Sequence, residues 1–245
     1  IVYIVALFRK KAMLWVIEIS KIFEKKTENT NKTEKIYKNV RIILRLHAKQ
    51  DKIYCIQENN RGYIMEKIYE TAYAKINLGL DVLGKRSDGY HEVRMVMQSV
   101  GLSDAVEIEE GEGLVVETDH SGLAGGPDNL AWKAAELLAR CCGKIPNVHI
   151  RLNKKIFLAA GLAGGSSDAA AVMRGLSRLW QLDLTAPELE KLAAELGSDI
   201  PFCITGGTAL AEGRGEILTE LPEAPELLLV LAKPKLEVAT GWVYG

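Results

Sequence analysis

Residues 65–245 predict an α+β fold, because strand-like and helix-like patterns both recur along them. The clearest strand lies over residues 71–82, where apolar and polar side chains alternate. The clearest helices lie over residues 130–141 and 165–179, where apolar residues recur at helical spacing. A chain of 245 residues is long enough to bury a full core between such elements.

The first 64 residues differ in composition from the remainder. They hold fourteen Lys or Arg and six Asp or Glu, a net charge of +8, whereas residues 65–245 carry −9. Their apolar runs, at 1–8 and 12–17, are shorter than the roughly 20 residues of a membrane span. We expect residues 1–64 to be an extension, poorly structured or non-native, with Met65 as the native start. The alternative is a basic amphipathic arm that touches a membrane surface.

The composition also limits the class of function. The acidic body disfavours a nucleic-acid binder, which needs a basic surface. The four cysteines and four histidines show no metal-ligand spacing, and two of the cysteines are adjacent. A protein of a reducing cytoplasm, without a membrane span, fits these observations best.

The strand at 71–82 carries two polar residues of interest. Residues two apart on a strand point the same way, so Lys75 and Asn77 are expected to lie side by side. Their face is either a solvated outer surface or part of a site. The opposite face, expected to be buried, consists of Ala72, Ala74, Ile76, Leu78, Leu80 and Val82.

A turn follows at residues 84–91 and ends on an aromatic residue and an imidazole, Tyr90 and His91. Both could contact a base, or both could begin the strand that continues through Val100. Further strands are expected at the short apolar segments 106–108, 114–116, 148–152, 208–211 and 227–232.

Capping signals mark two helices. Asp128 is the expected N-cap of the helix over 130–141, and Gly143 its stop. Thr185 and Glu188 form the pattern of a capping box for a second helix.

That second helix is expected to end at Gly197. Pro201 should hold Ile200 extended, which places Asp199 at a fixed bend. A carboxylate in this position is either a turn residue or a general base held by a rigid corner.

The glycine-rich stretch Ala160–Ala170 opens the helix over 165–179. A helix N-terminus has unpaired N–H groups and a partial positive charge, and glycines let a phosphate approach the backbone. Taken alone, the stretch is more typical of a tight turn made by the glycines and of a helix capped by its Ser166-Ser167-Asp168 start. Lys154 and Lys155 lie just upstream, where they could help to bind phosphate.

Six stretches, taken in order, resemble the GHMP superfamily of small-molecule kinases and, within it, the 4-diphosphocytidyl-2-C-methyl-D-erythritol kinases. The Asp-Gly-Tyr-His stretch narrows the resemblance to that family. The matching residues are 74–78, 88–91, 127–130, 160–170, 196–202 and 213–216. The resemblance implies a GHMP kinase N-terminal domain, of the ribosomal protein S5 domain 2-like fold, over 65–222. Residues 223–245 would begin a truncated, ferredoxin-like C-terminal domain.

The resemblance further implies ATP-dependent phosphorylation of the 2-hydroxyl of 4-diphosphocytidyl-2-C-methyl-D-erythritol, with Mg²⁺, in the non-mevalonate isoprenoid pathway. Asp199 would be the catalytic base, and Lys75 would orient it and offset negative charge. The substrate would contact Asn77, Tyr90, His91, Thr240 and Tyr244. ATP would contact Asn129, Lys154, Ala160, Gly161, Leu162, Ala163, Gly164, Gly165, Ser166 and Ser167.

Two departures from the family pattern keep alternatives open. Phe157 stands where the family usually has Pro, and the chain ends before the family's last glycine-rich motif. A non-catalytic nucleotide-binding module of the same fold is therefore the second hypothesis. A third, an RNA-binding domain of related topology, conflicts with the net charge of −9 in residues 65–245.

Overall fold

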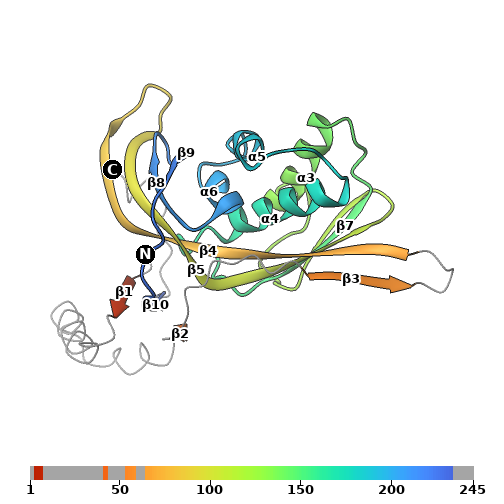
Figure 1. Cartoon of the computed structure of the whole chain (residues 1–245), viewed down its shortest axis with the longest axis horizontal. Helices are drawn as coiled ribbons and strands as arrows, with labels where there is room; N and C mark the ends of the chain where they lie inside the picture. Colours follow the sequence, from red (N-terminus) through yellow and green to blue (C-terminus); the bar gives the residue numbers. More distant parts are fainter. Residues whose placement is uncertain (1–2, 8–40, 44–52, 59–63, 234–245) are drawn as a thin grey trace.

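The computed structural model of the chain describes residues 3–7, 41–43, 53–58 and 64–233. Its central feature is a long antiparallel ribbon of two strands, β4 (Ile64–Lys85) and β5 (His91–Glu110) (Figure 1). β5 pairs with β7 (Val148–Asn153) along one part of its length and with β8 (Thr208–Glu212) along another. The sheet is completed by β6 (Leu114–Thr118), β9 (Ile217–Glu220) and β3 (Ile53–Glu58).

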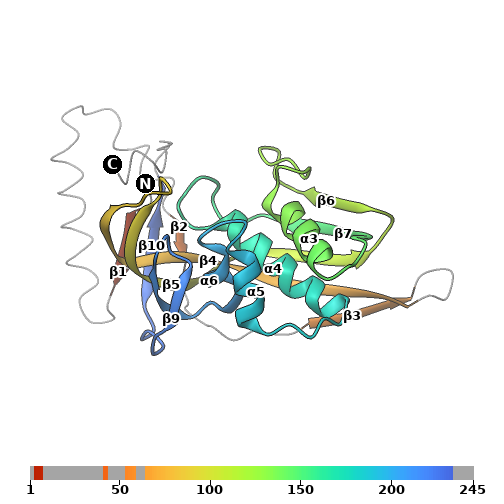
Figure 2. The same cartoon turned by 90° about the horizontal axis from the view of Figure 1, so that it is seen from above.

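The described helices all lie on one side of this ribbon, as Figures 1 and 2 show. They are α3 (Leu130–Cys141), α4 (Gly164–Leu179), α5 (Ala186–Ala193) and α6 (Ile200–Thr205). The main core forms where α3 and α4 cover β4, β5 and β7. This arrangement confirms the predicted α+β class.

Small residues let α4 lie close to the sheet. Ala169, Ala170 and Ala171 are fully buried, and Gly175 has no room for a side chain, because a methyl group there would overlap Ile108. The close packing fixes the N-terminus of α4, where the glycine-rich stretch enters, against the two long strands.

A second, three-stranded sheet has β10 (Leu228–Ala232) between β1 (Tyr3–Leu7) and β2 (Arg41–Ile43). Three strands of the first 64 residues are thus paired with later segments, because β3 also pairs with β4. Sequence analysis expected a poorly structured extension here. The paired segments are rich in Ile, Val and Tyr, which favour strands. The domain boundary at Met65 stays a prediction.

The long strands differ from the sequence prediction in two ways. β5 runs without a break through residues expected to separate two strands. The apolar face of β4 is buried at Ala74 and Ile76, but Leu78, Leu80 and Val82 are 44%, 38% and 42% exposed, so the prediction of a continuous buried face is wrong. The strand shifts register between Asn77 and Gly79, and such a bulge re-aims the side chains that follow it.

The capping box of Thr185 and Glu188 is confirmed. The N-cap of α3 is Asn129, not Asp128, because the Asn129 side chain accepts a hydrogen bond from the N–H of Ala131. α5 ends at Ala193 rather than at Gly197.

The predicted extended conformation of Ile200 is also wrong, since α6 begins there. Pro201 is tolerated in the first turn, where its missing N–H would have had no helical partner. Among the described residues, no helix is both long and apolar enough to cross a membrane.

Candidate active site

Lys75 and Asp199 form the centre of the candidate site. The ammonium of Lys75, on β4, lies 3.3 Å from Oδ1 of Asp199, which directly precedes α6. The same ammonium donates a hydrogen bond to Oδ1 of Asn77, at 3.2 Å. Lys75 is 5% exposed, whereas the Asp199 side chain is 34% exposed. The carboxylate is therefore oriented from its buried side and remains accessible from the other.

The geometry of β4 supports this arrangement. The predicted proximity of Lys75 and Asn77 is confirmed, and register shifts occur on both sides of them, at Tyr73/Lys75 and Asn77/Gly79. The strand is thus locally irregular on both sides of Lys75, which contacts Asp199, and of Asn77, which contacts Lys75.

The glycine-rich stretch meets the backbone of the same strand. The N–H of Lys75 donates to the carbonyl oxygen of Leu162 at 3.1 Å. Ala159, Gly161 and Ala163 all have positive φ, so the chain turns repeatedly before α4 begins at Gly164. The loop and the lysine are therefore held in fixed relation by main-chain contact.

No side chain caps the N-terminus of α4. The first helical hydrogen bond runs from the N–H of Ser167 to the carbonyl of Ala163, so the N–H groups of Gly164, Gly165 and Ser166 precede the ladder. The interpretation of Ser166, Ser167 and Asp168 as caps is wrong, since all three lie inside the helix. An uncapped N-terminus with partly exposed glycine backbone is a suitable anion site.

The hydroxyl of Ser167 faces the protein interior. It donates to the carbonyl oxygen of Tyr73 at 2.6 Å and lies 3.4 Å from the sulfur of Cys203. Burial raises the pKa of the Cys203 thiol to about 12, so this sulfur stays protonated at neutral pH. The Ser167 side chain thus joins α4, β4 and α6.

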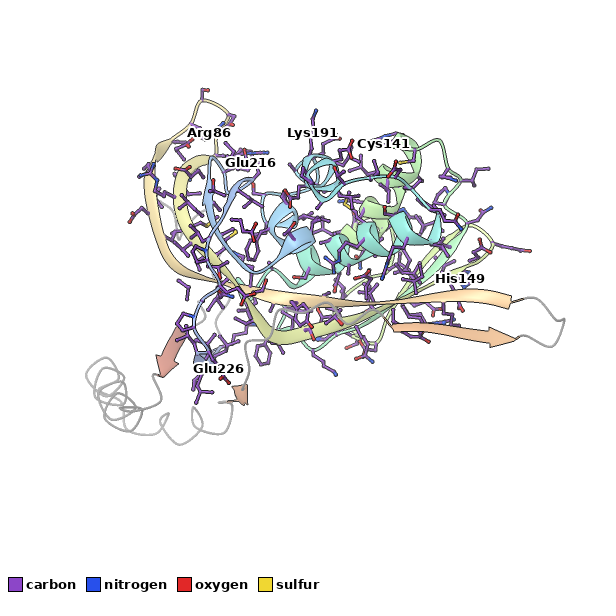
Figure 3. The ribbon with its side chains drawn as sticks, viewed as in Figure 1. Arg86, Cys141, His149, Lys191, Glu216 and Glu226 are labelled. Atoms are coloured by element: carbon purple, nitrogen blue, oxygen red, sulfur yellow. The ribbon has the colours of Figure 1, made fainter. Side chains whose placement is uncertain are left out.

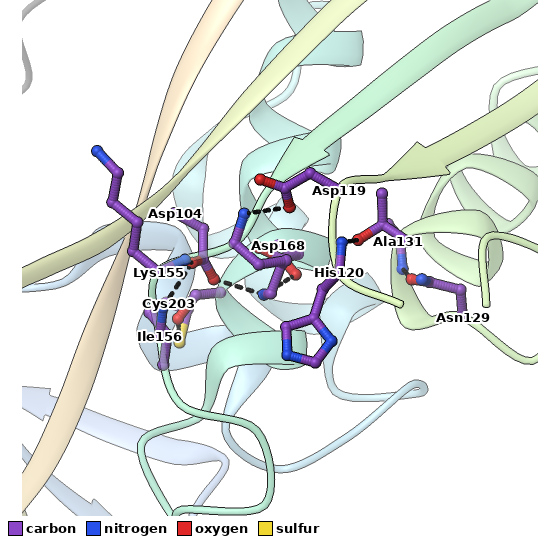
Figure 4. A network of polar contacts seen from close by, with 12 residues as sticks. Asp104, Asp119, His120, Asn129, Ala131, Lys155, Ile156, Asp168 and Cys203 are labelled. Carbon is purple, nitrogen blue, oxygen red and sulfur yellow. Dashed lines mark hydrogen bonds and ion pairs between the residues drawn. The ribbon is translucent and has the colours of Figure 1, made fainter. Parts of the chain in front are cut away.

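Lys154 is buried in a cluster that we call the Lys154 triad: Asp104, Lys154 and Asp168. Figure 4 labels the two aspartates of this cluster. The Lys154 ammonium contacts Oδ2 of Asp104 at 2.5 Å and also Oδ2 of Asp168, and all three side chains are 1% exposed or less. Asp104 further accepts hydrogen bonds from the backbone N–H groups of Lys155 and Ile156. The triad therefore fixes the segment that leads into the glycine loop.

The pKa of Asp168 is raised to about 7: burial raises it most, the Lys154 ammonium lowers it, and the nearby Asp104 carboxylate raises it. Oδ1 of Asp168 is buried without a hydrogen-bond partner in the described structure. Two carboxyl groups that share one ammonium are neutral overall when one of them carries a proton.

The sequence predicted Asp168 only as part of a helix cap, and Asp104 was not predicted to have a role. The available signal was a carboxylate next to apolar residues: Asp168 begins the alanine run of α4, and Asp104 is followed by Ala105 and Val106 of β5. A buried acid without an obvious partner calls for a buried base.

The residue that follows Asn129 lies against the glycine loop, because a methyl group placed on Gly165 would be 3.5 Å from Leu130. Both ends of the Asn129 amide have partners: its oxygen caps α3, and its nitrogen donates to the carbonyl of Ala124 at 2.8 Å. The side chain shapes the wall next to the glycine loop.

Tyr90 lies at the far end of the β4–β5 ribbon, 53% exposed, with the guanidinium of Arg214 4.8 Å from its ring centroid. His91 begins β5. In Figure 3, Arg86 on the ribbon and Glu216, two residues after Arg214, are both labelled at this end of the molecule.

The turn that carries Arg214 also reaches the neighbourhood of Asp199. A methyl group on Gly215 would lie 3.8 Å from Cβ of Ser198, the residue before Asp199. Tyr90 and Asp199 are therefore linked through one turn. Thr240 and Tyr244 lie outside the described residues.

Residues 129–207 match the family described as the GHMP kinases N terminal domain. This part of the chain is therefore similar to the N-terminal domain of GHMP kinases. The match covers α3, α4, α5, α6 and the glycine-rich loop.

Curated relatives share about half of the aligned residues with this chain. The chain is 50% identical over 182 residues to the 4-diphosphocytidyl-2-C-methyl-D-erythritol kinase of Acetivibrio thermocellus, covering 74% of this chain and 64% of the relative. It is 53% identical over 175 residues to the protein of the same name from a Synechococcus species, covering 71% and 57%. The chain thus spans about six tenths of the length of these relatives.

Solved structures show the same fold. A crystal structure of 4-(cytidine 5′-diphospho)-2C-methyl-D-erythritol kinase matches with a TM-score of 0.55 and 39% identity, over 63% of this chain and 55% of that one. A putative sugar kinase from Campylobacter jejuni, 16% identical, matches with a TM-score of 0.50 over 64% and 51%. The second match concerns the fold alone.

Proposed function

We propose that this chain transfers the γ-phosphoryl group of ATP to the 2-hydroxyl of 4-diphosphocytidyl-2-C-methyl-D-erythritol, in the non-mevalonate isoprenoid pathway. The observation that carries the proposal is the pairing of Lys75 with Asp199 beside a glycine loop that is hydrogen-bonded to the backbone of Lys75. The names of the relatives at 50% and 53% identity supply the substrate class.

Asp199 is the group that we assign as general base. Its partly exposed carboxylate takes the proton of the acceptor hydroxyl as the oxygen forms a bond to the γ-phosphorus, while the bond from that phosphorus to the bridging oxygen of ADP breaks. Lys75 orients the carboxylate through their ion pair, and its ammonium offsets the negative charge of the transferring group.

The glycine loop is the proposed binding site for the ATP phosphates. Its suitability rests on the glycines and on the uncapped N-terminus of α4, where the N–H groups of Gly164, Gly165 and Ser166 precede the helical hydrogen bonds. Lys154 contributes indirectly, by holding the entry to the loop through the Lys154 triad.

We ascribe Mg²⁺ to the nucleotide. Among the described residues there is no group of three or more His, Cys, Asp or Glu side chains that could hold a metal ion. Mg²⁺ in nucleotide sites keeps phosphate oxygens and water among its ligands, which a bound ATP and solvent would supply. Mg²⁺ would neutralise charge on the phosphates.

Tyr90 and His91 are the residues that we assign to the cytosine. An exposed aromatic ring with a cation over one face has the other face available for stacking on a base. Asn77 would contact the acceptor end of the substrate, and Thr240 and Tyr244 remain predicted contacts. We propose a reducing cytoplasm as the compartment, since Cys141, Cys142 and Cys203 are free thiols.

The test is a panel of acceptors offered to the chain with ATP and Mg²⁺, with transfer followed by ³¹P NMR and mass spectrometry. Phosphorylation of 4-diphosphocytidyl-2-C-methyl-D-erythritol, and not of galactose, homoserine or mevalonate, supports the proposal. Preference for another acceptor would overturn the substrate assignment. ATP binding without transfer to any acceptor would favour the non-catalytic nucleotide-binding module.

A further inference from the structure

Lys75 and Asp199 are anchored very differently. Lys75 lies within a long strand that is paired to β5 on either side of the residue. Asp199 precedes α6, a helix of only six residues, which is too short to be stable by itself. The alignment of the two groups therefore depends on what holds α6 against β4.

Arg174, on α4, makes contacts with both of these elements. Its Nη1 donates to the carbonyl oxygens of Cys203 at 2.6 Å and Ile204 at 3.3 Å, near the C-terminus of α6. Its Nη2 donates to the carbonyl oxygen of Thr71 on β4 at 3.0 Å, and its Nε to Oε2 of Glu70 at 3.1 Å. One planar guanidinium thus spans the strand of Lys75 and the helix of Asp199.

The contact with α6 reaches Asp199 through the backbone. The N–H of Cys203 donates to the carbonyl oxygen of Asp199 at 3.3 Å, and the carbonyl oxygen of Cys203 is one of the two that Arg174 holds. Carbonyl groups at the C-terminus of a helix lack helical hydrogen-bond donors and carry partial negative charge. The Arg174 guanidinium supplies both the hydrogen bonds and a positive charge. Movement of the guanidinium would move the first turn of α6 with it.

A second contact from the same helix acts in parallel. Ser167 lies two turns before Arg174 on α4 and joins Tyr73 of β4 to Cys203 of α6. Both contacts fall on the strand segment that leads into Lys75. The helix that begins at the glycine loop therefore sets the spacing between β4 and α6 as well.

We propose that Arg174 is a positioning residue that aligns the Asp199 carboxylate with Lys75. The anchoring of α6 follows from the hydrogen bonds alone, whereas the effect on turnover rests on the proposed function. Glu70, which also pairs with Arg178, keeps the guanidinium in place. If Arg174 only stabilised the fold, its ion pair with Glu70 would be sufficient, and its two hydrogen bonds to the carbonyl oxygens of α6 would not be needed.

The test compares Arg174→Met, Arg174→Lys and a control with a cavity elsewhere in the core, Leu138→Ala, each in the whole chain. Hydrogen–deuterium exchange of residues 199–206 is measured relative to a peptide from β7. Loss of hydrogen bonds to a charged group should speed exchange of 199–206 about tenfold or more in Arg174→Met. Arg174→Lys should show an intermediate effect, and Leu138→Ala none beyond its effect on β7.

Turnover is measured on the same variants. We expect kcat to fall about 10- to 100-fold in Arg174→Met, with the KM for ATP within about twofold of the parent value, because misalignment affects the transferring step. If Arg174→Met does not fold, exchange of residues 199–206 and kcat are compared between the parent, Arg174→Lys and Arg174→Gln instead.

The inference is overturned if the melting temperature falls but the relative exchange of 199–206 is unchanged, or if kcat per folded molecule is unchanged. Absence of transfer by the parent chain would count against the proposed function alone, since the exchange measurement still decides whether Arg174 anchors α6.

Discussion

Replacing Lys154 with Met removes the ammonium that Asp104 and Asp168 share, while it keeps most of the side-chain volume. Two carboxyl groups would then remain buried together, because both are 1% exposed or less. Removal of one partner from a buried ion pair typically costs about 3–5 kcal/mol. For a domain of this size, that loss corresponds to a fall of about 6–20 °C in melting temperature.

The assay is thermal unfolding followed by circular dichroism, together with ATP affinity by calorimetry. Lys155→Met is the matched control, because this neighbouring lysine is exposed and its backbone contact with Asp104 does not need the side chain. The control should change the melting temperature by no more than about 2 °C. The double variant Lys154→Met/Asp168→Asn should recover about half of the loss, since it leaves a single buried carboxyl group.

A different result would refute the assigned role of the Lys154 triad. If Lys154→Met leaves the melting temperature unchanged and weakens ATP binding about tenfold or more, the ammonium faces the nucleotide directly, and the buried arrangement does not represent the functional state.

Three further predictions concern the described residues. The pKa of Asp168 is raised to about 7 in the folded protein, mainly by burial, so its ionisation lowers the stability of the protein as the pH rises from about 4 to about 7. The melting temperature of Asp168→Asn should therefore fall less over that pH interval than the melting temperature of the parent. An equal fall in both proteins would contradict the raised pKa. Gly175→Ala should destabilise the protein by about 1–3 kcal/mol in urea unfolding, because the added methyl group overlaps Ile108, and an unchanged midpoint would show that α4 can shift. Tyr90→Leu should raise the KM for the cytidine substrate about tenfold or more, through loss of base stacking, with the KM for ATP unchanged; Tyr90→Phe is the control, and equal changes in both KM values would argue against a base-binding role.

Local patterns in the sequence predicted most of the fold. Helical spacing located α3 and α4, the capping box located the start of α5, and short apolar segments located β6, β7, β8 and β10. These features depend on contacts between residues near one another in the chain. The glycine-rich stretch was likewise predicted to open a helix, and α4 begins within it at Gly164.

The failures concern interactions over long sequence separations. Exposure of Leu78, Leu80 and Val82 depends on which elements cover β4, and alternation along the strand contains no information about those elements. The burial of Lys154 depends on two aspartates that lie 50 and 14 residues away from it. Ile200 is helical despite the following proline because packing of α6 outweighs a local preference.

In the candidate site, too, only the local relationships between residues were predicted from the sequence pattern. The pairing of Lys75 with Asn77 follows from strand geometry, and the structure shows it. The proximity of Lys75 and Asp199 required the family resemblance, because nothing local relates two residues so far apart in the sequence. Arg174 had no visible signal, since its partners are mostly backbone carbonyls.

The most direct test of the proposed function is the initial rate of phosphoryl transfer from ATP to 4-diphosphocytidyl-2-C-methyl-D-erythritol, at saturating concentrations, for the chain and for Asp199→Asn. The amide keeps the size of the side chain but cannot take the hydroxyl proton. A fall of about 10²- to 10⁴-fold in rate is expected, with ATP affinity unchanged. A rate for Asp199→Asn equal to that of the parent chain would contradict the role of Asp199 as general base.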